Sequence, residues 1–175
     1  QEIQKLLEEG IVFEPRPGLY SNIVVFDYRS LYPTIIGSHN ISPGTINCKC
    51  CEGEAKNAPL EDRNVWFCEK KKGFIPALIE ELITRRTRIK EIIKDKTDEK
   101  FAILDARQNS LKLLANSFYG YLGFFAARWY SIECAQATTA YGRYYIKDVM
   151  GKAQKEGFEV RYGDTDSIMI TLNGK

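Results

Sequence analysis

Two acidic side chains, two residues apart, are the sharpest chemical feature of this sequence. Asp164 and Asp166 lie in the segment 162–167, which reads YGDTDS and has apolar residues on both sides. In extended backbone, side chains two positions apart leave by the same face of a strand. We therefore expect the two carboxylates to repel each other and a cation to relieve that repulsion. A solvated turn is the simpler alternative.

A third carboxylate, Asp27, ends the apolar run IVVFD, where burial without a partner would be costly. If this run forms a strand that pairs with the hairpin around residues 158–172, Asp27 meets Asp164 and Asp166. Mg²⁺ prefers one or two protein carboxylates together with substrate phosphates and water. Two such ions about 4 Å apart can activate an attacking hydroxyl and stabilise a leaving oxygen. Many hydrolases and transferases could share this arrangement.

Polar side chains recur on one face of each of two predicted helices. The first row, spaced by four and then three residues, consists of Gln108, Lys112, Asn116 and Tyr119. The second row, spaced by four residues, consists of Arg86, Lys90 and Lys94. Facing rows of this kind on two antiparallel helices would grip a polyanion of triphosphate size, with Lys as a point charge and Arg as a planar fork. Two solvated helix faces are the alternative.

Four of the five cysteines flank one loop: Cys48, Cys50, Cys51 and Cys68. Cys48 and Cys51 have the C-x-x-C spacing of a zinc half-site, but the sequence has no second C-x-x-C. An intracellular chain normally keeps its thiols reduced. Three interpretations therefore remain open for this loop: reduced structural thiols, a disulfide, or a zinc site.

Length and composition set broad limits. A chain of 175 residues can bury one core, or one core with a protruding subdomain. The formal net charge of +2 does not by itself indicate a nucleic-acid partner, although cations cluster at residues 70–72 and 85–96. No apolar run reaches the ~20 residues of a membrane span, and no signal peptide is visible. We expect a cytoplasmic, nucleoid-associated protein without a membrane partner, and both chain ends have the character of cuts within a longer protein.

Hydrophobic periodicity and turn residues predict an α+β chain whose middle protrudes as helices. The predicted helices cover residues 2–9, 76–96, 99–119 and 132–155. The predicted strands cover residues 11–13, 23–28, 158–162 and 167–172. Thr97 or Asp98 is the expected N-cap of the helix at 99–119, which should stop at Gly120 and Gly123. Pro33 follows the strand at 23–28, in the segment SLYPTII, and a polar loop with cysteines and glycines then runs to about Lys72.

Three longer motifs resemble those of one enzyme family. The segment 27–36 (DYRSLYPTII) is similar to motif A of the family B DNA polymerases, 112–120 (KLLANSFYG) to their motif B, and 162–167 to their motif C, in the family's order. Three shorter segments resemble the archaeal branch: GFIP at 73–76, RWY at 128–130 and ECA at 133–135. That branch often has a second cysteine near Cys134, but Ser131 here precludes that disulfide.

The resemblance implies a fold in which an antiparallel-sheet palm packs on helices and a two-helix antiparallel fingers hairpin protrudes. The palm would comprise residues 1–72, with motif A and the cysteine loop, and residues 124–175, with motif C. The fingers, with motif B, would comprise residues 73–123. The exonuclease and thumb domains of the parent chain would lie outside this sequence.

The resemblance also implies roles for individual residues. Two Mg²⁺ ions, for which Mn²⁺ can substitute, would be held by Asp27, Asp166 and the backbone carbonyl of Tyr28, with Asp164 nearby. The incoming dNTP would contact backbone N–H groups around Ser30 and Leu31, and the side chains of Arg86, Lys90, Lys112 and Asn116. Tyr32 would crowd a ribose 2′-hydroxyl and so select deoxynucleotides. Tyr119 and Gly120 would pack against the nascent base pair of the primer–template DNA.

The expected function is template-directed addition of dNTPs to a primer 3′-hydroxyl with release of pyrophosphate. An RNA-making or reverse-transcribing polymerase would share the carboxylates, but the bulky Tyr32 argues against RNA synthesis. The alternative from another class is a folded fragment that binds nucleotide or DNA and is inactive in isolation. Primer extension by the chain itself distinguishes the two.

Overall fold

The computed structural model describes residues 12–13, 15, 17–93 and 100–172. Its helices are α2 (Leu31–Ser38), α3 (Phe74–Ile92), α4 (Phe101–Gly123) and α5 (Ile132–Lys155), with a 3₁₀ turn, η1, at Lys49–Cys51. Its strands are β1 (Val12–Phe13), β2 (Ile23–Asp27), β3 (Glu159–Asp164) and β4 (Ser167–Thr171). The predicted helix at 2–9 and the predicted N-caps Thr97 and Asp98 lie outside the described residues.

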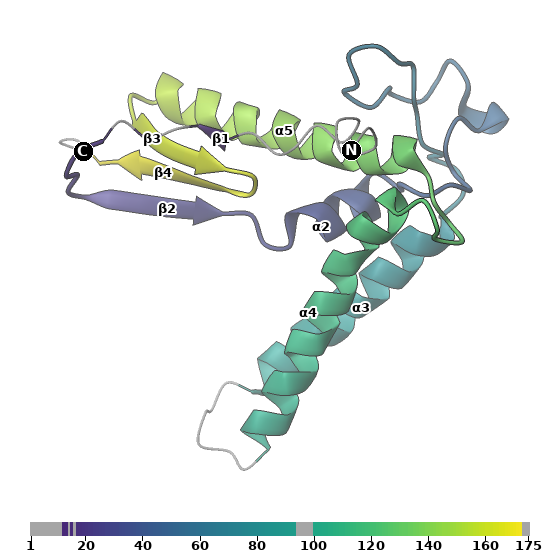
Figure 1. The fold of residues 1–175 in the computed structure, drawn as a ribbon, viewed down its shortest axis with the longest axis horizontal. Coiled ribbons are helices and arrows are strands. Elements are labelled where there is room, and N and C mark those ends of the chain that lie inside the picture. Colours follow the sequence, from purple (N-terminus) through teal and green to yellow (C-terminus); the bar gives the residue numbers. More distant parts are fainter. Residues whose placement is uncertain (1–11, 14, 16, 94–99, 173–175) are drawn as a thin grey trace.

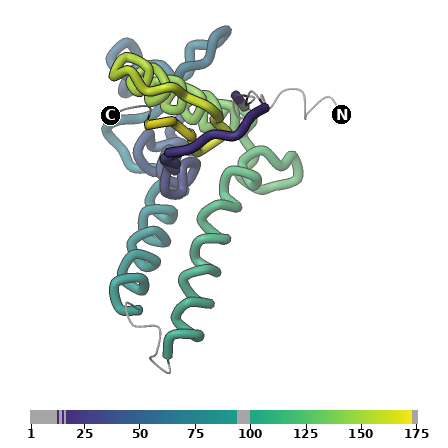
Figure 2. The backbone as a smooth tube through the Cα atoms, turned by 90° about the vertical axis from the view of Figure 1, so that its left-hand side faces the viewer, coloured from purple at the N-terminus to yellow at the C-terminus, as the bar shows by residue number. Residues whose placement is uncertain are grey.

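The four strands form one antiparallel sheet in the order β1-β3-β4-β2. Helix α5 runs along this sheet, while α3 and α4 project away from it as a long pair (Figure 1). A view turned by 90° shows the same pair standing clear of the rest of the chain (Figure 2). The α+β class, with an antiparallel sheet on helices and a protruding two-helix hairpin, is confirmed.

Two apolar clusters hold these parts together. One lies between the sheet and α5 and contains Ile146, Val160, Ile168 and Ile170. The larger one joins α2, the bases of α3 and α4, the loop that follows α2, and α5, around residues such as Ile36, Ile79 and Leu122. The hairpin is therefore anchored at its base and exposed along its length.

Helix α5 matches its predicted bounds because its ends carry clear signals. The hydroxyl of Ser131 accepts a hydrogen bond from the backbone N–H of Cys134 at 3.3 Å, as an N-cap should. Glu133 lies in the first turn, and Lys152 and Lys155 lie in the last, where each charge favours the helix dipole. The position that precludes a disulfide thus serves to start the helix.

Two helices were not fully predicted from the sequence. The segment SLYPTII is mostly helical, because α2 starts at Leu31 and places Pro33 in the first turn, where a missing N–H costs no helical hydrogen bond. Helix α4 continues beyond Tyr119 and through Gly120, and it ends at Gly123, the second glycine of the predicted pair. Packing at the base of the hairpin outweighs the low helix propensity of glycine there. None of the described helices is long and apolar enough to cross a membrane.

Candidate functional site

Strand pairing brings the three aspartates to one edge of the sheet. Strand β4 lies between β2 and β3, and Ser167 at its start is opposite Asp27 on one side and Asp164 on the other. The backbone N–H of Tyr28 donates to the carbonyl oxygen of Asp166 at 2.8 Å. The predicted convergence of Asp27 with the 162–167 turn is therefore present in the fold.

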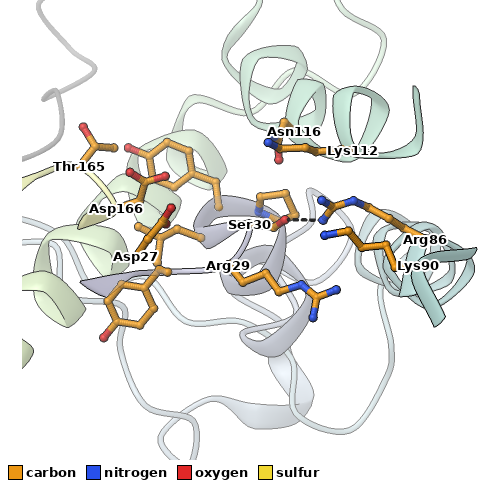
Figure 3. A pocket seen from close by; sticks show the side chains of 13 residues that line it. Asp27, Arg29, Ser30, Arg86, Lys90, Lys112, Asn116, Thr165 and Asp166 are labelled. Carbon is orange, nitrogen blue, oxygen red and sulfur yellow. Dashed lines mark hydrogen bonds between the residues drawn. The ribbon is translucent and has the colours of Figure 1, made fainter. Parts of the chain in front are cut away.

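The two acidic residues of the turn do not leave by one face of an extended strand, as the sequence argument assumed. Thr165 between them has a positive φ of 47°, so the backbone turns there. The carboxylate of Asp164 accepts hydrogen bonds from the hydroxyls of Tyr162 at 3.2 Å and Thr165 at 2.8 Å. Asp166 instead faces Asp27 (Figure 3). The close carboxylate pair is thus Asp27 with Asp166.

The electrostatics of this pair favour a bound cation. Partial burial raises the pKa of Asp166, and the nearby carboxylates of Asp27 and Asp164 raise it further, while Lys112 acts in the opposite direction. A raised carboxyl pKa means that ionisation of Asp166 costs additional free energy in the folded chain. A cation placed between Asp27 and Asp166 would remove that cost, and carboxylate oxygens are ligands that Mg²⁺ prefers.

Asp27 and Asp166 line one end of an open cavity of about 490 Å³. Its wall continues over Tyr28, Arg29, Ser30, Leu31, Tyr32 and Pro33, and its far side is formed by Arg86, Lys90, Lys112 and Asn116. Figure 3 shows the two carboxylates at one end and the cations of α3 and α4 at the other. This volume is within the range of small-molecule sites.

The first turn of α2 forms the middle of the cavity wall. Ser30 precedes the helix in left-handed backbone, with φ 53° and ψ 55°, and its carbonyl accepts the first helical hydrogen bond, from Thr34. The first N–H groups of a helix have no intrahelical partner and attract anions. Leu31 and Tyr32 therefore offer backbone donors between the carboxylates and the cations.

The cations of the hairpin lie close enough together to repel one another. Burial lowers the pKa of Arg86, and the charge of Arg29 lowers it further. The pKa of Lys90 is lowered chiefly by Arg86, then by burial, Arg29 and Lys112. These cations repel one another, as the carboxylates of Asp27 and Asp166 do at the other end of the cavity. An anion of several charges would offset the repulsion between the cations.

Gln108 has another role than the sequence suggested. Its side chain is buried at 5% exposure and accepts a hydrogen bond from Nε of Arg86 at 3.2 Å. It also donates to Asp105 at 2.9 Å. A second guanidinium nitrogen of Arg86 donates to the Ser30 hydroxyl at 3.4 Å. Gln108 therefore orients Arg86 toward the cavity and does not itself line it.

Tyr32 lies between the cavity and α5. Its ring is 4.7 Å from the ring of Tyr119, centroid to centroid, at a 40° tilt. Burial, followed by the neighbouring Tyr119, raises the pKa of Tyr32 to about 12, so this phenol stays neutral near pH 7. On its other side, a Cβ added to Gly142 would lie 3.2 Å from Cε1 of Tyr32. Gly142 thus gives the Tyr32 ring room against α5.

Four features of the site were not predicted from the sequence: Arg29, Thr165, the orienting role of Gln108, and Gly142. Arg29 and Thr165 stand within quoted motifs, so their place in the sequence was the available signal. A glycine inside a predicted helix was the signal for Gly142, since that position gives up helix propensity. Gly120, predicted to pack on a base pair, is exposed in α4 next to Tyr119.

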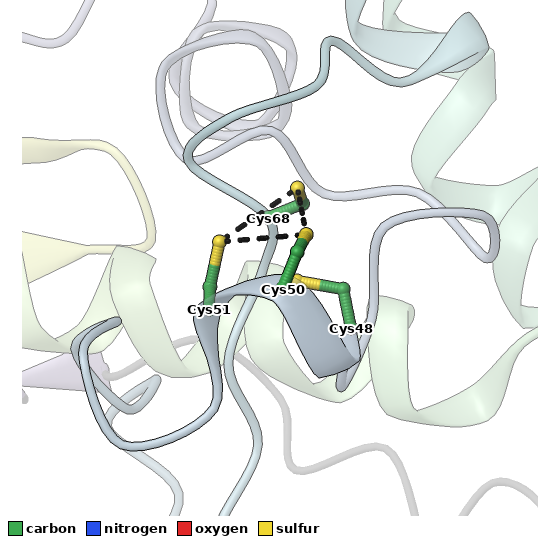
Figure 4. A group of neighbouring side chains, drawn as sticks. All are labelled: Cys48, Cys50, Cys51 and Cys68. Carbon is green, nitrogen blue, oxygen red and sulfur yellow. Dashed lines mark hydrogen bonds between the residues drawn. The ribbon is translucent and has the colours of Figure 1, made fainter.

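The four loop cysteines gather at a second place, outside the lining of this cavity. Cys48, Cys50, Cys51 and Cys68 bring their sulfur atoms within 4.8 Å of one another (Figure 4). None of the five cysteines of the chain forms a disulfide. The fifth, Cys134, is buried in α5.

Comparisons with known proteins identify one family. The model of DNA polymerase family B matches residues 1–175. The chain is 44% identical over 176 residues to DNA polymerase 1 of Pyrococcus abyssi, covering 99% of this chain and 22% of that protein. It is 46% identical over 168 residues to the DNA polymerase of Thermococcus gorgonarius, covering 94% of this chain and 21% of that protein.

The solved structure of the family B DNA polymerase from the hyperthermophilic archaeon Pyrobaculum calidifontis aligns with a TM-score of 0.77 at 38% identity. The alignment covers 96% of this chain and 22% of that one. The chain belongs to DNA polymerase family B, and the resemblance to archaeal members is confirmed. It spans about a fifth of the length of the relatives it matches.

Proposed function

We propose that this chain forms the palm and fingers of a DNA-directed DNA polymerase. The palm comprises residues 1–72 and 124–175, and the fingers comprise residues 73–123. Helices α3 and α4, from Phe74 to Gly123, support the proposed limits of the fingers. The sheet with its aspartates supports the assignment of the palm.

The observation that carries the proposal is that the two ends of the cavity carry opposite charges. Carboxylates of Asp27 and Asp166 lie at one end and the cations of α3 and α4 at the other. A dNTP fits this pattern with its β- and γ-phosphates toward Arg86, Lys90, Lys112 and Asn116. The backbone N–H groups around Ser30 and Leu31 hold the triphosphate between the ends, and the α-phosphate faces the carboxylates.

The carboxylate end fits two divalent cations, Mg²⁺ or Mn²⁺. Asp27 and Asp166 would hold both, with the backbone carbonyl of Tyr28 completing one site and Asp164 nearby in a less direct role. When bound, such ions activate a hydroxyl for attack and offset the charge of the leaving oxygen. The raised pKa of Asp166 supports this fit, because Asp27 raises that pKa more than any other charged group does.

In the proposed reaction, the primer 3′-hydroxyl attacks the α-phosphorus of the dNTP and the bond to the bridging oxygen breaks, releasing pyrophosphate. Arg86, Lys90 and Lys112 neutralise the charge that builds on the departing phosphates. Tyr32 crowds the position of a ribose 2′-hydroxyl and so favours deoxynucleotides over ribonucleotides. Tyr119 and Gly120 pack against the new base pair, and primer–template DNA supplies the sequence information.

A second candidate is a nucleotide- or DNA-binding fragment without turnover. The chain spans about a fifth of its relatives, and exonuclease and thumb domains of a parent chain would lie in the remainder. Primer extension by the isolated chain with Mg²⁺ and dNTPs separates the candidates. Nucleotide incorporation would support the polymerase function directly, whereas dNTP binding without incorporation would support a fragment that binds nucleotide without turnover.

The metal assignment is tested in a chimera in which this chain replaces the matching segment of the Thermococcus gorgonarius DNA polymerase. Asp166→Ala should lower incorporation by at least about 100-fold, the scale of losing one charge-stabilising group. The control is Asp148→Ala, since Asp148 lies on α5 and pairs with Lys152 at 2.7 Å. Unchanged incorporation by Asp166→Ala would refute the metal assignment.

A further inference from the structure

We propose that Cys48, Cys50, Cys51 and Cys68 form a structural zinc site. The Sγ atoms of Cys50 and Cys51 are 3.8 Å apart, those of Cys50 and Cys68 3.5 Å, and those of Cys51 and Cys68 3.9 Å. Cys48 completes the group within 4.8 Å (Figure 4). The site lies apart from the cavity of the proposed polymerase reaction and does not depend on that reaction.

These separations match tetrahedral zinc. A Zn–S bond of about 2.3 Å in a regular tetrahedron places sulfurs about 3.8 Å apart. A disulfide would require an S–S distance of about 2.05 Å, and each of the three measured pairs is far longer. A four-iron cluster would spread its thiolates over different iron atoms, so a single small tetrahedral ion is the better occupant.

The surroundings of the sulfurs suit a ligand set better than simple packing. Cys51 and Cys68 are buried, but Cys50 is exposed and Cys48 half-buried, so burial of apolar thiols does not explain the group. The backbone N–H of Lys71 donates to Sγ of Cys68 at 3.3 Å. Four thiolates around Zn²⁺ leave a net charge of −2. Lys70 donates to the carbonyl of Cys50 at 2.7 Å and also pairs with Glu54 at 2.8 Å.

The backbone on both sides of the site is already fixed. A short antiparallel contact pairs Ile46 with Phe67. The indole N–H of Trp66 donates to the carbonyl of Cys48 at 3.1 Å. The two ligand-bearing segments, 48–51 and 68, therefore meet without rearrangement, which reduces the entropy cost of metal binding.

The site would tie the long loop after α2 to the base of the hairpin. Asn40, just after α2, donates to the carbonyls of Cys68 and Lys71 and accepts from the N–H of Gly73, which precedes α3. A metal that fixes Cys68 thus also fixes the start of α3. Structural zinc sites contribute directly to folding free energy.

The test begins with the metal content of the chain, expressed with added zinc sulfate and purified under mild reductant without chelator. We expect one zinc ion per chain by elemental analysis. Cys50→Ser should lose it, because this variant removes one ligand at an exposed position. Cys134→Ser is the matched control: its thiol is buried in α5 outside the cluster, and it should keep the zinc.

Further measurements keep the proposal falsifiable if Cys50→Ser does not fold. A chelator should lower the midpoint of thermal unfolding of the unaltered chain and of Cys134→Ser, and zinc sulfate should restore it. Cobalt titrated into the chelated chain should give the absorption bands of a tetrahedral thiolate site. Purification without zinc and without cobalt bands would overturn the proposal. So would an intact mass lower by two hydrogens per bridge, which indicates a disulfide.

Discussion

The backbone N–H of Tyr28 donates to the carbonyl oxygen of Asp166 at 2.8 Å. This bond extends the β2–β4 ladder by one step beyond Asp27, into the turn that carries the second carboxylate. The spacing of Asp27 and Asp166 is thereby set by main-chain pairing, which is stiffer than contact between flexible side chains. A site that must hold charged groups at fixed separation gains from such a frame.

The pH dependence of stability should report on Asp166. Its pKa is raised in the folded chain, so the folded state binds more protons than the unfolded state in the window above the ordinary pKa of aspartate. Its contribution to stability is therefore full below that ordinary value and is lost as pH rises through the folded pKa. With a chelator present, the stability of Asp166→Asn relative to that of the unaltered chain should increase as the pH rises from acidic to neutral. Urea unfolding at several pH values measures this, and Mg²⁺ should shrink the difference. Identical pH profiles would contradict the prediction.

Ribose discrimination should depend on the bulk of Tyr32. In the chimera, Tyr32→Ala should raise the ratio of ribonucleotide to deoxynucleotide kcat/KM by about tenfold or more, equivalent to ~1.4 kcal/mol of discrimination. Tyr32→Phe keeps the ring and removes only the hydroxyl, so it should keep the discrimination. If Tyr32→Ala shows no gain in ribonucleotide use, Tyr32 is not the selecting residue.

Two glycines of α5 offer a matched pair. Gly142→Ala places a Cβ 3.2 Å from Cε1 of Tyr32, whereas a Cβ at Gly151 meets no atom within 4 Å. Gly142→Ala should cost about 1–3 kcal/mol of unfolding free energy through overpacking and displace the Tyr32 ring. Gly151→Ala should be neutral or stabilise by up to about 1 kcal/mol through helix propensity. Denaturant unfolding compares the two, and equal stabilities would contradict the close packing of Tyr32 on Gly142.

Neighbouring arginines of α3 should differ sharply. Arg86 lines the cavity and is oriented by Gln108, while Arg85 pairs with Glu81 on the exposed side of the helix. Arg86→Ala should raise the KM for dNTP in the chimera by about 10- to 100-fold, the scale of one charged hydrogen bond. Arg85→Ala should leave the KM near its starting value. Similar KM values for the two variants would remove Arg86 from the phosphate site.

Asn40 should contribute to stability through its three hydrogen bonds. Its amide contacts the carbonyls of Cys68 at 2.6 Å and Lys71 at 2.8 Å and the N–H of Gly73 at 2.8 Å. Asn40 has a positive φ of 54°, so replacement by glycine removes the bonds without adding backbone strain. Asn40→Gly should cost about 2–4 kcal/mol at roughly 1 kcal/mol per bond. Asn22→Gly, at an exposed position that also has φ 54°, is the control. Equal unfolding midpoints would show that the bonds do not stabilise the loop.

Local features of the sequence determined much of this protein. The apolar periodicity of α3, α4 and α5 indicated the helices, and the β-branched run before Asp27 indicated a strand, because these signals act over a few residues. Family membership followed from three motifs in order. The helix at 31–38 was not predicted, because a proline in the first turn of a helix resembles a loop signal when read along the chain.

The tertiary structure decided which of those residues meet. Pairing of β2 with β4 placed Asp27 beside Asp166, and the left-handed backbone of Thr165 turned the chain between Asp164, which contacts Tyr162, and Asp166. Burial placed Gln108 beneath Arg86, and the packing of α5 made Gly142 a neighbour of Tyr32. Antiparallel contact between residues 46 and 67 gathered cysteines that the sequence left with three interpretations. Each of these outcomes depends on register and packing between distant segments, which no local pattern specifies.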